Sequence, residues 1–570
     1  PAASFAMSWV HPGNVFGEFD THETLVALSV KRPGKYTLAW TVTDGDTEKS
    51  EPPRTRVFSS DELFRLDLTN YKPGWYALDW KLSDAEGTTL MTHAASFAVM
   101  GKDTRQSKQG EGPYATWEGV GPHYLTPTKF AAYNGELMNK MGVRLTSGIG
   151  MPGVFADAKF REREKIGRVL FADHLHREVK PNMTAEEEEA LVEKFKKRRA
   201  EYPESFLGQV FWEDSSQPYR QAPEITGGAF DPSVESLKGM SNRVVQARAV
   251  SAFMRKHFPE IKISLGQSLC CSELIAEQIR AGLGDKDIDY MGLEHVGRAN
   301  LPERPNSGSM TTADLYREMA ELMGRPSWKP GCGVETNFRR DTFLGQEKQA
   351  RYYARDALIG IAWRFPLINI GGLVDAGNHY CETAWGNDGL CKRWPMLYPK
   401  KAYVAYAALT KALDCVTDAK LLPTGDDCAY MMACPRRDGK TAYALWTSYG
   451  TADYEIKVNS TAQPSTFNLN LVSFFGRETE LKVKGDVLKV TATERPSYLI
   501  VEGGTVVSVK TLKRTYPEDV KPSDYKAVVR CDDAHGLSFL VHHGHGNQVV
   551  FTHQLRHGLL VVQSVGAHEG

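Results

Sequence analysis

Hydrophobic and polar positions alternate through the first hundred residues. Large side chains recur at every second position from Tyr36 to Val42, with Thr or Ala between them, which is the period of a half-buried strand. A second aromatic strand runs from Trp75 to Trp80, after the turn signal Pro73-Gly74. Short strands separated by Gly, Pro and Asp turns predict an immunoglobulin-like β-sandwich over residues 1–108. The polar stretch 101–112 predicts a linker.

From residue 113 to 415 the pattern changes to short apolar runs followed by helical periods. The clearest helix follows Thr184, which stands three residues before Glu187 as in a capping box. Acidic residues fill its first turns and Lys196–Arg199 its end, so this charge run predicts a solvated helix and not a binding patch. Leu191, Val192 and Phe195 form its expected buried stripe. Eight apolar runs are found in order, beginning near Val120, Val143, Arg168, Gly208, Lys262, Tyr290, Gly333 and Leu367.

Eight strand-then-helix units over this length predict a (β/α)8 TIM barrel. An open doubly wound sheet is disfavoured because Gly331-Cys332-Gly333 lacks the third glycine of a dinucleotide-binding loop. After Ala412 the helical period stops. Runs such as 440–447, 466–475, 480–483 and 487–493 predict a C-terminal β-sandwich over 416–505. Residues 506–570 are again strand-like and predict an additional or incomplete β-module.

Composition excludes some classes of function. The 570 residues carry a formal net charge of −1, so bulk charge gives no reason to expect a nucleic-acid partner. No apolar run reaches the roughly 18 residues that a membrane span needs. All nine cysteines lie at or after Cys270 and none forms a C-x-x-C pair, which disfavours a disulfide framework or a zinc site. His542, His543 and His545 also lack a second spaced ligand pair, so no metal site is expected.

Ionisable residues at the carboxyl ends of the expected strands are the candidates for chemistry, because barrel enzymes work at that edge. They are Arg144 on the second strand, Glu213 and Asp214 on the fourth, Glu294 and His295 on the sixth, Glu335 on the seventh and Asp375 after the eighth. Two carboxyl groups that face each other are what glycosidic cleavage requires. A single carboxylate at a strand end is more often a helix cap or a salt-bridge partner, and Arg144 can equally be a core ion-pair residue.

At these residues the chain resembles clan A of the glycoside hydrolases, and its family 39-like members in particular. The resemblance implies an acid/base at Glu213, a nucleophile at Glu335, a nucleophile-supporting Arg144 and a site-lining His295. It also implies an accessory C-terminal β-sandwich, carried by Lys440–Thr447 and Arg495–Leu499. The matching barrel segments are Met141–Arg144, Gln209–Glu213, Asp289–His295, Pro326–Glu335 and Gln349–Ala362.

One position departs from the clan pattern. The clan has Asn directly before its acid/base, and here that residue is Trp212. Either the substrate is held differently at that carbon or Asp214 is the acid, and Glu294 is a weaker rival for either role. Trp212 and Trp385 are the aromatic residues expected to contact sugar rings.

The expected activity is retaining hydrolysis of a polysaccharide or oligosaccharide, by double displacement and with no cofactor. The alternative is a non-catalytic carbohydrate-binding protein on a degenerate barrel, which the Trp212 replacement favours. Secretion, or a periplasmic or cell-surface location, is implied by the resemblance only. The sugar, the linkage, endo or exo action and the oligomeric state are left open.

Overall fold

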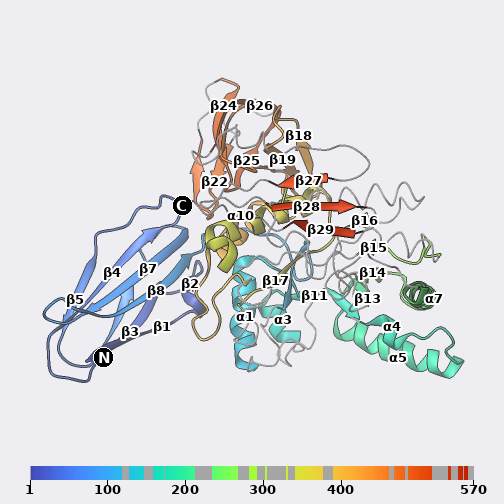
Figure 1. Ribbon diagram of the computed structural model, residues 1–570, viewed down its shortest axis with the longest axis horizontal. Coiled ribbons are helices and arrows are strands. Elements are labelled where there is room, and N and C mark those ends of the chain that lie inside the picture. The colour runs from blue at the N-terminus through green and yellow to red at the C-terminus, as the bar shows by residue number, and fades with distance from the viewer. Residues whose placement is uncertain are drawn as a thin grey trace.

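The computed structural model describes most of the chain. The residues described are 2–118, 128–146, 158–172, 174–211, 234–266, 282–284, 286–291, 302–303, 329–330, 341–375, 389–460, 468–481, 485–516, 537–540, 550–555 and 558–562. Figure 1 places the N-terminal sheets at the left and the antiparallel strands β18 to β26 at the top. The parallel strands and their helices lie to the right of the N-terminal sheets and below those antiparallel strands.

Two sheets in the first hundred residues enclose one hydrophobic core. One sheet has the order β1 (Ala3–Trp9), β3 (Glu23–Val30), β6 (Glu62–Asp67); the other has the order β2 (Val15–Phe16), β8 (Thr89–Val99), β7 (Gly74–Ser83), β4 (Tyr36–Asp44), β5 (Arg54–Phe58). Every pair is antiparallel except β2 with β8. The predicted alternation is confirmed, because alternate residues of β4 from Tyr36 to Val42 are buried. Trp40 faces Trp80 across the β4–β7 pair, with ring centroids 5.4 Å apart.

Parallel strands follow, in chain order. They are β9 (Tyr114–Glu118), β10 (Leu145–Thr146), β11 (Gly167–Arg168), β12 (Leu170–Ala172), β13 (Leu207–Phe211), β14 (Lys262–Gly266), β15 (Tyr290–Met291), β16 (Lys329–Pro330) and β17 (Ile368–Gly372). From β9 to β16, each strand pairs in parallel with the next, except that β11 and β12 do not pair and are separated by one residue of the chain. The last strand, β17, pairs in parallel with the first, β9.

In the described part of the chain, the helices that follow these strands are α1 (Thr128–Met141), α3 (Ala158–Arg163), α4 (Leu175–Glu178), α5 (Ala185–Glu201), α7 (Val234–His257), α10 (Asp341–Ala362) and α11 (Lys401–Ala412). The predicted capping box is confirmed: the Thr184 hydroxyl accepts from the Glu187 backbone, and the Glu187 carboxylate accepts from the Thr184 backbone. Phe195 is fully buried, and Leu191 and Val192 pack beside it. The expected first strand is misplaced, because it starts at Tyr114 and not near Val120, which lies outside the described residues.

The remaining chain forms further antiparallel sheets. A six-stranded sheet has the order β18 (Lys420–Leu422), β19 (Ala429–Pro435), β20 (Thr441–Thr447), β25 (Ser497–Glu502), β22 (Asn468–Val472), β23 (Glu478–Glu480), and it shares a core with β24 (Val487–Thr493), β21 (Thr451–Ser460) and β26 (Gly504–Thr515). The boundary expected at residue 505 therefore falls within β26. Strands β27 (Leu537–Leu540), β28 (Val550–Leu555) and β29 (Gly558–Val562) form a separate sheet.

An ion-pair network ties the three regions together at α10. The Glu347 carboxylate lies 2.6 Å from Arg495 Nε of the C-terminal sheets and 2.7 Å from Lys401 Nζ of α11. Arg495 also pairs with Glu48 of the N-terminal region. Burial alone would raise the pKa of Glu347, but hydrogen bonds from Arg495 and Lys401 lower it to about 2. The network fixes α10 against both flanking regions while Glu347 stays ionised.

Candidate functional site

Most of the residues predicted for the site lie outside the described residues. These are Trp212, Glu213, Asp214, Glu294, His295, Glu335 and Trp385. What the structure does describe is the scaffold from which their segments depart. β13 ends at Phe211, two residues before Glu213, and β16 ends at Pro330, five residues before Glu335. Both strands belong to one parallel sheet, so the two segments leave from the same edge of it.

The two faces of these strands differ in chemistry. Val210, Ile263 and Leu265 pack against the helices in one hydrophobic cluster. Alternation places Gln209 and Ser264 on the opposite, interior face. Near the amino ends of the strands the interior is apolar; its cluster is Ala115, Leu145, Val169, Leu170, Leu207 and Leu367. One step toward the carboxyl ends the interior turns polar.

Gln209 and Ser264 form this polar layer together with Asn369 of β17. Gln209 and Ser264 are direct partners in the β13–β14 register. All three side chains are fully buried. Among the described residues, neither amide atom of Gln209 nor the hydroxyl of Ser264 has a hydrogen-bond partner. Buried polar groups of this kind cost stability and concentrate at functional sites.

Arg144 does not lie where it was expected. Gly142, at φ 76°, ends α1, and β10 begins only at Leu145, so Arg144 precedes its strand and sits at the amino edge. Its buried guanidinium donates to the Asn139 side chain and lies 3.7 Å from an Asp103 carboxylate oxygen. Burial, and to a smaller extent the neighbouring Arg105, lower the pKa of Arg144. The Asp103 carboxylate partly offsets this decrease. These contacts correspond to the core ion-pair alternative.

Asp375 follows β17, as expected, and forms an ion pair with Lys400. Its carboxylate pairs with Lys400 Nζ at 2.5 Å, and both side chains are almost fully buried. The Asp375 backbone N–H donates to the Cys391 carbonyl at 2.9 Å, and the Cys391 N–H donates to Leu373 at 2.8 Å. This ladder joins the two ends of the connection between β17 and α11. Asp375 therefore holds the segment after β17 against Cys391 and Lys400.

A buried carboxylate that sequence reasoning missed is Glu303. It accepts hydrogen bonds from Arg355 Nε (2.9 Å) and Nη2 (2.7 Å) on α10, and from Trp446 Nε1 (2.8 Å) on β20. The side chains of Glu303 and Arg355 are 1% and 0% exposed. Three donors and full burial hold this carboxylate as a structural anchor between α10 and the C-terminal sheets. No local sequence signal links residues so far apart.

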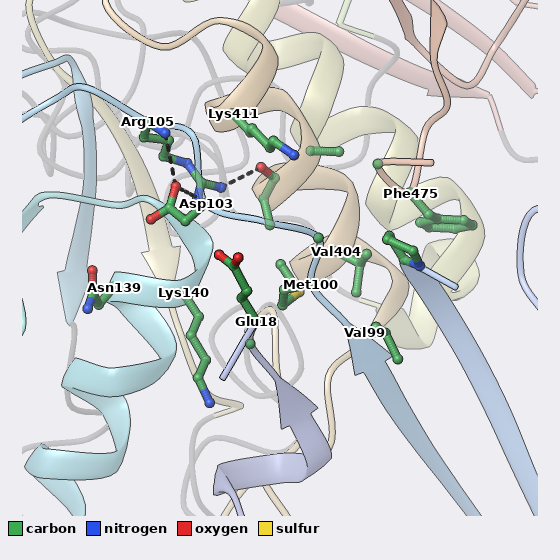
Figure 2. A pocket seen from close by; sticks show the side chains of 16 residues that line it. Glu18, Val99, Met100, Asp103, Arg105, Asn139, Lys140, Val404, Lys411 and Phe475 are labelled. Atoms are coloured by element: carbon green, nitrogen blue, oxygen red, sulfur yellow. Dashed lines mark hydrogen bonds and ion pairs between the residues drawn. The ribbon is translucent and has the colours of Figure 1, made fainter. Parts of the chain in front are cut away.

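A cavity of about 120 Å³ lies at the junction of the N-terminal region, α1, α11 and the C-terminal sheets. Figure 2 shows Glu18, Asp103, Lys411 and Phe475 around it. Three of the charged residues that line it form ion pairs: Arg105 with Asp103 at 2.9 Å, and Lys411 with Glu478 at 2.9 Å. It lies outside the strands, among helices and sheet edges, and is not a candidate for the chemistry.

One group of side chains has the composition of a metal site: His11, Asp20 and Glu136. Lys140 Nζ lies among them, 2.6 Å from Asp20, 2.7 Å from Glu136 and 2.9 Å from the Val15 carbonyl. Although partial burial raises it, the hydrogen bond from Lys140 brings the pKa of Asp20 below its usual value. The lysine ammonium thus supplies the positive charge, and its three acceptors match its three donors.

Among the described residues, no helix is both long and apolar enough to cross a membrane.

Comparison with solved structures finds a likeness to a glycoside hydrolase. The chain is similar to a family 39 glycoside hydrolase from the gut symbiont Bacteroides cellulosilyticus WH2, with a TM-score of 0.56 and 18% sequence identity, over 82% of this chain and 97% of that one. At this identity the likeness concerns the fold alone. A β-glucuronidase of Bacteroides uniformis (TM-score 0.38, 11% identity, 89% of this chain and 60% of that one) is too distant to carry an argument. No protein-family model matches the sequence, and no curated protein matches it significantly. The chain is thus a mixed α/β protein with the fold of a family 39 glycoside hydrolase structure.

Proposed function

We propose that this protein is a retaining glycoside hydrolase built on a (β/α)8 barrel between β-sandwich regions. The observation that carries the proposal is the pairing order of the parallel strands. They pair in parallel from β9 to β11 and from β12 to β16, β12 continuing β11 after one residue, and β17 pairs with β9. Pairing between the first and the last strand is what a closed barrel requires. The fold likeness to a family 39 glycoside hydrolase supports the same architecture. The proposed regions are 1–108, 113–415, 416–505 and 506–570.

In the proposed mechanism Glu335 attacks the anomeric carbon while Glu213 protonates the departing glycosidic oxygen. Glu213 then removes a proton from water, which hydrolyses the glycosyl-enzyme and restores the configuration. The departure of both segments from one sheet edge and the polar interior layer beneath that edge support this assignment. Asp214 is the alternative acid.

The residues proposed to contact the substrate are Trp212, Glu294, His295 and Trp385. The clan resemblance favours a polysaccharide or its oligosaccharides as the substrate, met outside the cytoplasm. Arg144 is left out of the proposed site, because its guanidinium is engaged at the opposite end of its strand.

The test compares single substitutions on a panel of aryl glycosides. Glu335→Gln is expected to abolish turnover, because an amide cannot form the covalent intermediate. Glu213→Ala is expected to slow poor leaving groups by about 10²- to 10⁴-fold, to spare activated ones in the first step, and to yield a glycosyl azide when azide is added. Glu18→Gln, in the junction cavity outside the strands, is the matched control.

Near-normal activity of Glu335→Gln would overturn the nucleophile assignment. A loss in Asp214→Asn with azide rescue, and none in Glu213→Ala, would move the acid/base role to Asp214. Sugar binding by the wild type without release of product on any glycoside would favour the non-catalytic carbohydrate-binding alternative.

A further inference from the structure

Three aromatic rings from separate parts of the chain meet at the surface. Trp9 ends β1, Tyr133 lies on α1, and Trp394 lies in the connection between β17 and α11. The Tyr133 and Trp394 rings are parallel within 2°, with centroids 6.1 Å apart. Trp9 stands edge-on to both, at 5.0 and 5.9 Å. Trp394 is 38% exposed, so part of its indole surface meets the solvent.

The turn that carries Trp394 is held firmly. Lys392 N–H donates to the Tyr398 carbonyl at 2.8 Å, and Met396 N–H donates to Arg393 at 3.1 Å. Trp9 Nε1 donates to the Pro395 carbonyl at 3.0 Å, directly beside Trp394. At the foot of the turn, the Pro399 carbonyl accepts from Trp75 Nε1 (2.9 Å) and the Ser96 hydroxyl (2.7 Å). The exposed indole therefore stands on a preorganised support, and little ordering entropy is lost when a ligand binds it.

The same contacts place the rings near the proposed working edge. The bridge between Val374 and Cys391 is parallel, so the chain at Cys391 runs in the direction of β17. The following turn, with Trp394, extends beyond the carboxyl end of that strand. Tyr133 lies in the helix that follows β9, the parallel neighbour of β17. Both elements thus belong to connections that leave the carboxyl ends of adjacent strands.

We propose that Trp9, Tyr133 and Trp394 form a glycan-binding platform on which a sugar ring of a polysaccharide chain stacks against the Trp394 indole. Rigid exposed aromatic rings suit the apolar faces of pyranoses, because they offer a large contact area and lose little conformational entropy. Placed beside the carboxyl edge, the platform binds a chain that extends past the catalytic residues. It rests on the proposed function for its choice of ligand, and it implies that the substrate is a polymer or a long oligosaccharide.

The test is native electrophoresis of the full chain in gels that contain one soluble polysaccharide each, from a panel of xylan, laminarin, galactan and glucomannan. The wild type is expected to be retarded by at least one of them. Trp394→Ala is expected to need a roughly tenfold higher polysaccharide concentration for equal retardation, whereas Trp394→Phe recovers much of the effect because it restores a stacking ring. Phe19→Ala removes another exposed aromatic side chain, 94% exposed, and is the matched control. Circular dichroism and thermal melting verify that each variant is folded.

Equal retardation of wild type and Trp394→Ala in a gel that retards the wild type would overturn the platform. So would the absence of retardation of the wild type throughout the panel. Because retardation needs no turnover, a protein that is retarded through Trp394 but hydrolyses nothing would refute the proposed function and leave the platform standing.

Discussion

Removing the Glu303 carboxylate should destabilise the protein strongly. In Glu303→Ala, the Arg355 guanidinium loses both of its bonds to this residue and the Trp446 indole N–H loses its acceptor. Burial alone would lower the pKa of Arg355, but the charge and hydrogen bonds of Glu303, with smaller contributions from Tyr352 and Glu494, raise it above the usual value. Without this partner, the fully buried Arg355 guanidinium loses its hydrogen-bonded counter-charge. Breaking buried pairs of this kind typically costs about 3–5 kcal/mol of the free energy of unfolding.

The assay is urea denaturation at neutral pH, followed by tryptophan fluorescence and circular dichroism. Replacing both partners with apolar residues, as in Glu303→Met with Arg355→Met, should recover a large part of the loss, because no unpaired charge is left buried. Glu193→Ala is the matched control: its carboxylate pairs with Lys196 at 2.7 Å, but the two side chains are 57% and 62% exposed. This exposed pair should contribute little.

Two results would refute this reasoning. One is a Glu303→Ala variant that unfolds at the same urea concentration as Glu193→Ala. The other is a double methionine variant as unstable as Glu303→Ala, which would show that shape and not charge compensation is what the site requires.

Three further outcomes are expected. The pKa of Glu347 is lowered to about 2 from an ordinary 4.5, so its contribution to stability is complete above pH 4.5 and is lost as the pH falls toward 2. The free energy of unfolding of Glu347→Gln should therefore depend less on pH in that window than that of the wild type. An unchanged pH dependence would contradict this. Gln209→Met should raise the free energy of unfolding by about 1 kcal/mol, because two buried polar atoms without a partner among the described residues are removed at similar volume. A lower free energy of unfolding in urea denaturation would show that the amide forms hydrogen bonds. Thr184→Ala should cost α5 about 1 kcal/mol, seen as faster hydrogen exchange in its first turn, and unchanged exchange would argue against the cap.

Local signals predicted local structure well. The capping box at Thr184 and the alternation in β4 depend on neighbouring residues only, and the structure confirms both. The same period-two signal runs through β21 from Ala452 to Val458, where a strand was not expected although alternate residues are buried. The alternation was therefore sufficient to predict β21 from the sequence.

Positions that depend on the ends of elements were harder to predict. Arg144 lies in an apolar run, and the run itself does not reveal that α1 ends only three residues earlier and that the strand begins after the arginine. Glu303 is 52 residues from Arg355 and 143 from Trp446, and no sequence period connects such partners. The proposed catalytic glutamates rest on the order of strands, which the sequence showed in outline and the strand pairing supports.

The central claim is that Glu335 forms a covalent glycosyl-enzyme, and intercepting that intermediate tests it most directly. The protein would be incubated with a panel of 2-deoxy-2-fluoro glycosides bearing activated leaving groups, chosen after the aryl-glycoside screen, and its intact mass and peptide masses measured. We expect a mass increase of one fluoroglycosyl unit, located on the peptide that contains Glu335 and absent in Glu335→Gln. A label on another residue, or rapid hydrolysis of the parent glycoside with inversion and no label, would contradict it.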